Sequence, residues 1–248
     1  HLAHAEAYLD GLYRGSLPDR ERRRLGFQDG PLWLHRDRTG CGGTIAALHS
    51  ALQLGASAHL GGGTHHASRN RGGGFCLLND VAVATLWALD LGISPLLLVD
   101  LDAHYPDGTA QILGKRKEAY MISLHRADGY PRQRPPFEGI SIDLEAGTGD
   151  ACYLEALSEG LKRIPERPWK AALLVLGGDV LTGDRFGGMN LSLGGVGLRD
   201  HLVLSWLEQR QIPRAVVLGG GYPRGPIGGL LRLHLRSVLR LLGQTASV

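Results

Sequence analysis

Residues 96–109 read LLLVDLDAHYPDGT, an apolar run that ends in a dense group of polar side chains. The run 96–99 predicts a strand buried on both faces, as in a parallel sheet covered by helices. Four ionisable residues then follow: Asp100, Asp102, His104 and Asp107. Negative charge at the end of a buried strand is costly unless positive charge compensates for it. The stretch therefore predicts an α/β core with a functional site at the end of one strand.

Predicted strands and helices alternate along the chain, and glycine clusters separate them. The apolar patterns predict strands over 57–60, 96–101, 120–124, 171–176 and 215–218. They predict helices over 45–54, 79–91 with Asn79 as its cap, 150–164, 198–208 and 227–242. Such alternation is typical of a mainly parallel central sheet with helices on both faces. We therefore expect one α/β domain over residues 1–248.

Composition narrows the class of protein. The chain has 248 residues, is 43% hydrophobic and 21% charged, and carries a formal charge of +3, as ordinary globular domains do. This small charge gives no case for a direct nucleic-acid partner, and the basic run 20–24 is interpreted as a solvated helix face. No apolar run is long enough to span a bilayer, so no membrane association is expected. The cysteines, Cys41, Cys76 and Cys152, are far apart without metal-ligand spacing, which favours free thiols and a cytoplasmic location.

Polar residues follow four of the predicted strands directly. They are His65 and His66, the acidic group at 100–107, Asp179, and Tyr222. Parallel α/β sheets bind their ligands at the carboxyl ends of the strands. We therefore expect these four segments, which are distant in sequence, to meet at one edge of one sheet.

Asp102 and His104 are candidate metal ligands, because alternate side chains of an extended segment point the same way. Asp179 would add a third ligand from a separate loop. Two carboxylates and one imidazole leave one coordination position open, as in catalytic zinc sites. A zinc ion would supply the positive charge that the acidic group requires and would lower the pKa of its water to about 7. The alternative is that these aspartates are helix caps and turn residues.

His65 and His66 are candidates for a general base and a general acid, since imidazole exchanges protons near neutral pH. Asp100 and Asp107 would fix the tautomers of the two rings. Tyr222 follows three glycines, and its hydroxyl would polarise a carbonyl and stabilise an oxyanion. The alternatives are incidental surface histidines and an ordinary turn tyrosine.

The motifs around these residues resemble those of the histone deacetylase superfamily, and look like those of its bacterial and class IV-like members. In order, they are GGGTHHASRNRGGGFCLLND (61–80), VDLDAHYPDGTA (99–110), SLH (123–125), GTGD (147–150), LGGDVLTGD (176–184) and GGGY (219–222). The resemblance runs from about His1 to Leu242. It implies the arginase–deacetylase α/β fold and the zinc-dependent hydrolysis of N-acyl amides, typically acetyl-lysine.

The resemblance also implies roles for the residues at matching positions. The zinc ligands would be Asp102, His104 and Asp179. The catalytic group would be His65 with Asp100, His66 with Asp107, and Tyr222. The acyl-lysine tunnel would be lined by Gly74, Phe75 and Tyr130. A structural potassium ion beside the zinc would be bound by Asp100, Asp102, His104, Ser123 and Leu124.

Several positions depart from the family pattern. Tyr105 stands where His or Gln is usual, and Gly178 replaces a usual Ala. The stretch 129–132 replaces an aromatic-rich one, which leaves the tunnel width and the acyl preference open. The family's N-terminal segment, which normally adds a strand and part of the site rim, is expected to be missing before His1.

Two other functions fit part of the pattern. An arginase-like dimanganese ureohydrolase shares the fold and a DAH motif, but it needs further aspartates and does not use the paired histidines with the tyrosine. A catalytically weak or inactive zinc protein that recognises acyl-lysine would keep the same ligands. The substrate stays open among acylated lysine, an acylated polyamine and a small acyl-amine. The sequence also leaves the oligomeric state open.

Overall fold

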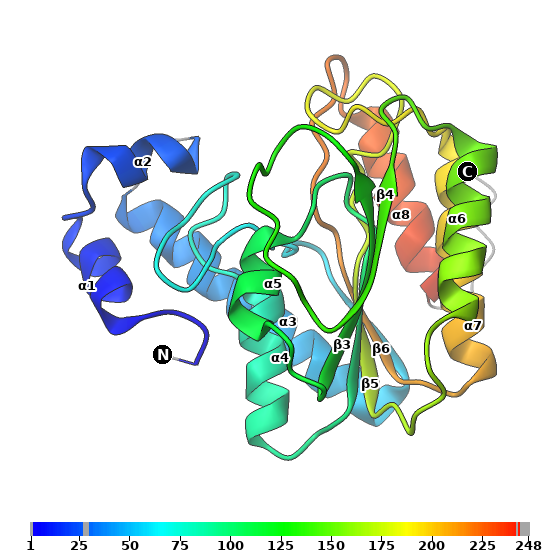
Figure 1. The fold of residues 1–248 in the computed structure, drawn as a ribbon, viewed down its shortest axis with the longest axis horizontal. Helices are drawn as coiled ribbons and strands as arrows, with labels where there is room; N and C mark the ends of the chain where they lie inside the picture. Colours follow the sequence, from blue (N-terminus) through cyan, green and yellow to red (C-terminus); the bar gives the residue numbers. More distant parts are fainter. Residues whose placement is uncertain (1, 27–29, 242, 244–248) are drawn as a thin grey trace.

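A parallel sheet runs through the centre of the chain (Figure 1). The computed structural model describes residues 2–26, 30–241 and 243. Within them six strands form one sheet, and all neighbours in it pair in parallel. The order across the sheet is β1 (Ala56–His59), β6 (Arg214–Val217), β5 (Ala171–Val175), β2 (Leu96–Asp100), β3 (Ala119–Arg126) and β4 (Gly139–Leu144). The predicted α/β class with a mainly parallel sheet is confirmed.

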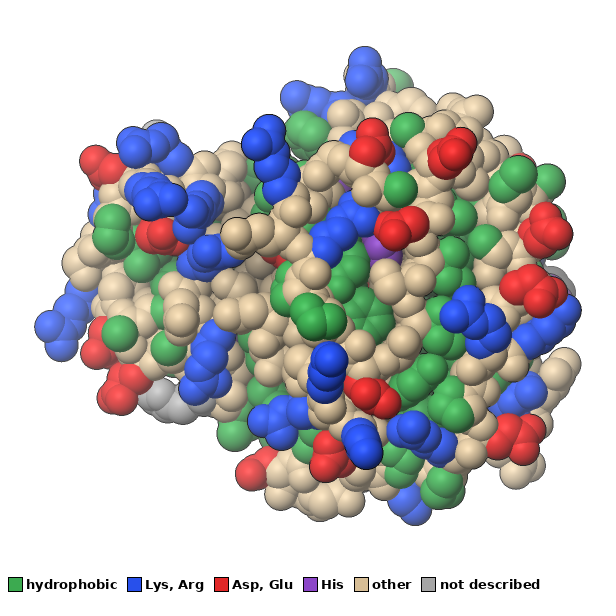
Figure 2. Space-filling view, viewed as in Figure 1, with side chains coloured by type: hydrophobic (Ala, Val, Ile, Leu, Met, Phe, Trp, Pro, Cys, Tyr) green, Lys and Arg blue, Asp and Glu red, His purple; other side chains and the backbone are tan. Residues whose placement is uncertain are grey.

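Helices cover both faces of this sheet, as predicted (Figure 1). One face packs against α3 (Pro31–Leu54), α4 (Asp80–Asp90) and α5 (Asp107–Leu113). The other packs against α6 (Asp150–Lys162), α7 (Leu193–Gln209) and α8 (Gly228–Leu241). Two short helices, α1 (Glu6–Arg14) and α2 (Asp19–Leu25), lie outside the first layer. Arginines of the basic run lie on the surface of α2, as the sequence indicated (Figure 2).

The central strands owe their position to uninterrupted apolar sequence. All five residues of β2 and all five of β5 are buried. Because successive side chains alternate between faces, Leu97 and Val99 join the core under α6 to α8, whereas Leu96 and Leu98 join the core under α3 to α5. The strand that ends in Asp100 therefore lies in the middle of the molecule.

Some elements were not predicted or begin elsewhere. Strand β4 lies at the edge of the sheet, so only alternate positions such as Ile140 and Leu144 are buried and its apolar signal is weak. Helix α5 is only seven residues long and begins at Asp107, the last of the acidic residues that follow β2. The sequence pattern predicts a helix face for the basic run in α2 but no bounds for α1 or α2. The two ends of the family resemblance, His1 and Leu242, lie outside the described residues.

Glycines concealed the true starts of two helices. Helix α3 begins at Pro31, not at residue 45, because glycines in its middle lowered its apparent helical propensity. Gly43 has a packing reason: a Cβ atom there would lie 2.6 Å from Nε2 of His59 in β1. Helix α7 likewise begins before residue 198, where the Ser192 hydroxyl accepts a hydrogen bond from Gly195 N–H.

Two further expectations concern the whole described chain. Among the described residues, no helix has both the length and the apolar character needed to cross a membrane. Cys41 and Cys76 are buried and Cys152 is exposed, and all three are free thiols, as predicted.

Candidate active site

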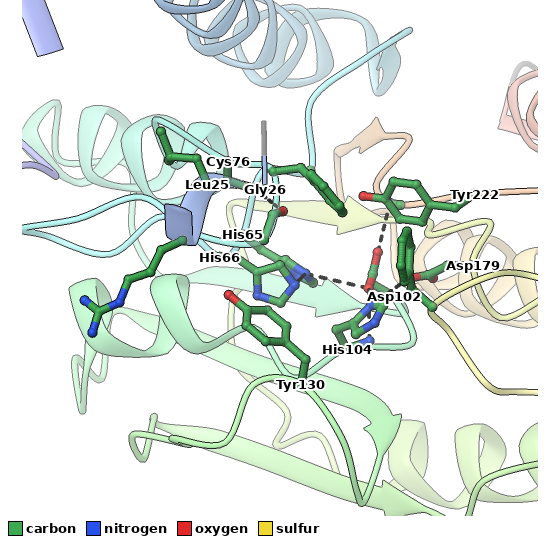
Figure 3. Close-up of a pocket in the computed structure, with 16 residues that line it drawn as sticks. Leu25, Gly26, His65, His66, Cys76, Asp102, His104, Tyr130, Asp179 and Tyr222 are labelled. Carbon is green, nitrogen blue, oxygen red and sulfur yellow. Dashed lines mark hydrogen bonds and ion pairs between the residues drawn. The ribbon is translucent and has the colours of Figure 1, made fainter. Parts of the chain in front are cut away.

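The carboxyl ends of the strands open into one cavity, and the predicted polar segments meet there (Figure 3). The cavity has a volume of about 260 Å³. Its lining includes the polar residues predicted from the sequence: His65, His66, Asp102, His104, Asp179 and Tyr222. They come from the loops after β1, β2, β5 and β6, so the expected convergence at one sheet edge is confirmed.

Three side chains form a candidate metal centre at the base of this cavity. His104 Nδ1 lies 3.0 Å from Asp102 Oδ1 and 2.8 Å from Asp179 Oδ2. The three candidate ligand atoms lie within 4.8 Å of one another. Two oxygens and one nitrogen that share a divalent ion at about 2.0–2.2 Å must lie this close together. The donor set therefore fits a zinc-like ion with little adjustment.

Backbone N–H groups hold the two carboxylates in place. Asp102 Oδ1 accepts from His104 N–H at 3.0 Å, and its Oδ2 accepts from Gly220 N–H at 2.9 Å. Asp179 Oδ1 accepts from Ala103 N–H at 2.9 Å. Each carboxylate is thus fixed by the loop of another strand, which orients it before any ion binds.

The two histidines stand side by side, and each has its own carboxylate. His65 Nδ1 lies 2.8 Å from Asp100 Oδ2, and His66 Nδ1 lies 2.6 Å from Asp107 Oδ1. The Nε2 atoms of the two rings are 3.2 Å apart. Since Nδ1 is engaged in both rings, Nε2 is the nitrogen that each presents to the cavity, as Figure 3 shows for the ring positions.

The same two histidines have pKa values shifted in opposite directions. For His65, burial disfavours the charged form, but the carboxylates of Asp100 and Asp102 outweigh burial and raise the pKa to about 9. For His66, burial and the charge of His65 act together and lower the pKa to about 4. Two adjacent imidazoles with separated pKa values suit a proton donor and a proton acceptor.

Charge at the candidate metal centre is balanced by His104. Burial lowers its pKa, but Asp102 and Asp179 outweigh burial and raise it to about 11. Burial and the charge of Asp102 raise the pKa of Asp179 to about 7. A proton on the imidazole therefore holds the carboxylates together, and a divalent ion would release that proton on binding.

Aromatic side chains form the walls of the cavity. The Phe75 and Phe186 ring centres lie 5.4 and 5.1 Å from that of Tyr222, and Tyr130 approaches His66 at 4.8 Å from the opposite side (Figure 3). Burial and then the charge of Asp102 raise the pKa of Tyr222, which keeps its hydroxyl protonated. Walls of this kind accept an apolar chain and exclude water.

Gly74 allows this wall to lie against the catalytic candidates. Its φ is +52°, and a Cβ atom there would lie 2.4 Å from Cδ2 of His66. Phe75 has φ of 65°, an uncommon value for a non-glycine residue, and its N–H donates to Leu25 O at 3.0 Å. The expected tunnel residues Gly74, Phe75 and Tyr130 therefore all line the cavity.

Several lining residues were not predicted from the sequence. They are Arg24, Leu25 and Gly26 at the end of α2, together with Gly63, Cys76, Phe186 and Gly220. An aromatic residue in the glycine-containing segment after β5 was a signal for Phe186. The end of α2 offered no signal, because ordinary residue types reach the cavity there only through packing.

Two of the residues expected for a potassium site, Ser123 and Leu124, are buried in β3. In the β2–β3 ladder, Ser123 is the partner of Asp100, and Leu124 follows it. The Ser123 hydroxyl lies 2.8 Å from His125 Nδ1. The potassium site stays a prediction.

Comparison with known families decides the relationship of this chain. The family model described as histone deacetylase domain matches residues 1–238. The chain belongs to the histone deacetylase domain family. Within that family it is 33% identical over 225 residues to an uncharacterized protein of Picosynechococcus sp.. The matched region covers 90% of this chain and 75% of that protein. It is also 33% identical over 195 residues to Histone deacetylase 2 of Arabidopsis thaliana, covering 76% of this chain and 50% of that protein.

Solved structures of histone deacetylase homologues share the fold. The homologue from Aquifex aeolicus superimposes with a TM-score of 0.84 at 24% identity, over 99% of this chain and 70% of that one. A histone deacetylase homologue complexed with SAHA gives a TM-score of 0.83 at 26% identity, over 99% and 70%. The chain thus spans less than the full length of these relatives, and about half of the Arabidopsis protein. The predicted arginase–deacetylase fold is confirmed.

Proposed function

We propose that this histone deacetylase family member is a zinc-dependent amidohydrolase. It removes an acyl group, in the first instance acetyl, from an N-acyl amine such as acetyl-lysine. The observation that carries the proposal is the convergence of His104, Asp102 and Asp179 beside two carboxylate-paired histidines in one cavity. Membership of the family and the SAHA complex of a structural relative support acyl-lysine-like binding.

The metal centre is assigned by its donor chemistry. Asp102, His104 and Asp179 would hold zinc, since two carboxylates and an imidazole converge there with the cavity on their open side. When bound, zinc supplies a Lewis acid for the amide carbonyl and lowers the pKa of water to about 7.

The remaining chemistry belongs to the side chains. The Tyr222 hydroxyl donates a hydrogen bond to the scissile carbonyl and stabilises the negative charge that develops on its oxygen. The adjacent His65 and His66 rings take up, as a pair, one proton of the attacking water at Nε2, and His66 then donates that proton to the leaving amine. Asp100 and Asp107 hold the rings so that Nε2 faces the substrate. The products are a carboxylate and a free amine.

The walls of the cavity orient the substrate. Phe75 and Tyr130 contact the methylene chain of the acyl-amine, as their places in the cavity lining support: Phe75 packs beside Tyr222, and Tyr130 beside His66. Acylated lysine, acylated polyamines and small acyl-amines share such a chain, so all are candidate substrates. A dimanganese ureohydrolase is less well supported, because the described residues offer a single cluster of three candidate ligands.

The test is turnover of a fluorogenic acetyl-lysine peptide and a panel of acyl-amines of varied chain length. We expect turnover with zinc, loss after chelation, and recovery when zinc is restored. Tyr222→Phe should lower kcat by about 10²-fold or more, because one oxyanion donor is lost. A folded, zinc-loaded protein that binds acetyl-lysine peptide but never cleaves it would favour the inactive recognition protein.

A further inference from the structure

A fully buried arginine lies directly beneath the candidate metal centre. Arg199, in α7, is 0% exposed and is the largest side chain so completely buried among the described residues. A buried guanidinium is costly unless its donors are satisfied. Its position on the side of the sheet that α6 to α8 cover therefore requires a reason (Figure 1).

Two of its hydrogen bonds reach the backbone of the metal-ligand loops. Nη1 donates to Leu101 O at 3.1 Å and to Gly177 O at 2.7 Å. Leu101 directly precedes Asp102, and Gly177 stands two residues before Asp179. One nitrogen with two hydrogens therefore joins the two segments that carry the carboxylate ligands.

The hydrogen bonds of Arg199 join the two segments just beyond the point where strands β2 and β5 stop pairing. The β2–β5 ladder closes with the pair Asp100 and Val175, and Leu101 N–H donates to Val175 O at 2.9 Å. Beyond that point the two chains turn into separate loops. The guanidinium thus supplies, at Leu101 and Gly177, the cross-link that ladder hydrogen bonds supply further back.

The arginine is itself held from behind. Its Nε lies 2.8 Å from Asp200 Oδ1, and its Nη2 lies 2.8 Å from the same oxygen. The other oxygen of Asp200 accepts a hydrogen bond from the Ser237 hydroxyl of α8. Because the guanidinium is a rigid planar fork, Asp200 fixes the direction in which Nη1 points.

We propose that Arg199 is a positioning residue for the metal centre. By joining the carbonyls of Leu101 and Gly177, it sets the separation of Asp102 and Asp179 and thereby the affinity for a divalent ion. This inference rests on the proposed metal-dependent function. A purely structural buried ion pair would be replaceable without effect on metal affinity, whereas a partner that orients ligands from outside contributes about 10–100-fold to that affinity.

The test compares zinc affinity in three variants of the whole chain. Affinity is measured by competition with a chromophoric chelator, and thermal unfolding is followed with and without zinc. Arg199→Met should weaken zinc binding about 10–100-fold and reduce the rise in Tm that zinc produces. Arg199→Lys keeps the charge but not the fork, and should weaken binding less.

Leu207→Ala is the matched control. Leu207 is a fully buried residue of the same helix, about 12 Å further along it at 1.5 Å per residue. It should lower Tm while leaving zinc affinity unchanged. Wild-type zinc affinity in folded Arg199→Met, or in Arg199→Lys if the first variant fails to fold, would overturn the positioning role. If the unsubstituted protein binds no zinc, the metal-dependent function falls and this inference falls with it.

Discussion

His66 and Asp107 are the pair on which the proposed proton transfer to the leaving amine depends. The 2.6 Å contact between Nδ1 and Oδ1 orients the ring and stabilises its charged form. Asp107→Asn keeps the shape but removes the charge, so proton uptake by His66 becomes harder. We expect kcat to fall about 10²-fold, within the range for general acid–base catalysis, with KM changed less than about threefold. Steady-state kinetics on an acetyl-lysine peptide, with zinc content checked by elemental analysis, measures both.

Asp90→Asn is the control for this change, since Asp90 is an exposed carboxylate at the end of α4. It should leave both constants at their wild-type values. A normal kcat in Asp107→Asn would mean that His66 needs no charged partner, and would remove Asp107 from the catalytic group.

Residue chemistry explains what the sequence could and could not predict of the site. Asp102, His104 and Asp179 were recognisable because ionisable side chains are unusual directly after buried strands. Arg199 was not, because an arginine in a predicted helix is ordinary. Its partner carbonyl at Leu101 is 98 positions away, and only packing of α7 against the sheet brings them together.

At the scale of elements, the segment 127–138 between β3 and β4 carries Tyr130 into the cavity wall. It is anchored by Tyr105, whose hydroxyl donates to Pro135 O at 2.5 Å and whose ring lies 5.4 Å from the Arg134 guanidinium. Tyr105→Phe removes the hydrogen bond and keeps the ring. Because Tyr130 then sits on a looser segment, we expect KM for the peptide to rise several-fold, with kcat within about twofold and stability lowered by about 1 kcal/mol.

Tyr120→Phe provides the comparison, since Tyr120 lies near the start of β3, at the end of the strand opposite the cavity. Tyr120→Phe should change neither kcat nor KM. A fall in kcat with unchanged KM in Tyr105→Phe would place Tyr105 in the chemistry and contradict the anchoring role. The sequence identified Tyr105 as a departure from the family pattern, but its contact with residue 135 depends on a segment whose path no local pattern specifies.

At the scale of the whole molecule, apolar strand runs and helix-ending glycines were enough to predict the class of fold and the edge at which the site lies. The outer helices were not predictable in the same way. They are attached by an apolar cluster that joins Tyr8, Leu12 and Leu25 to Leu77. Hydrogen bonds such as Ala5 N–H to Arg69 O at 2.8 Å and a buried His4 add to this attachment. His4 Nδ1 lies 2.9 Å from Ser68 O, and His4 Nε2 accepts from Asn79 N–H at 2.9 Å.

This attachment makes stability depend on pH. Burial lowers the pKa of His4 to about 4, against about 6.5 when unfolded, and Nε2 is unprotonated in the folded protein, where it accepts from Asn79 N–H. Between these values the unfolded state binds the proton and the folded state does not, so the free energy of unfolding falls as pH drops from 6.5 towards 4. Over that window we expect wild type to lose on the order of 2–3 kcal/mol more than His4→Gln, measured by urea unfolding.

The difference in the free energy of unfolding between wild type and His4→Gln separates the effect of His4 from that of other buried histidines. His125 and His234 also have pKa values lowered to about 4 by burial, but they titrate in both proteins and cancel. His201→Gln, at an exposed position, should follow the wild-type pH curve. Parallel curves for wild type and His4→Gln would show that the N-terminal segment leaves the domain before His4 is protonated. The outer helices would then unfold separately from the sheet, as a local unit of low stability.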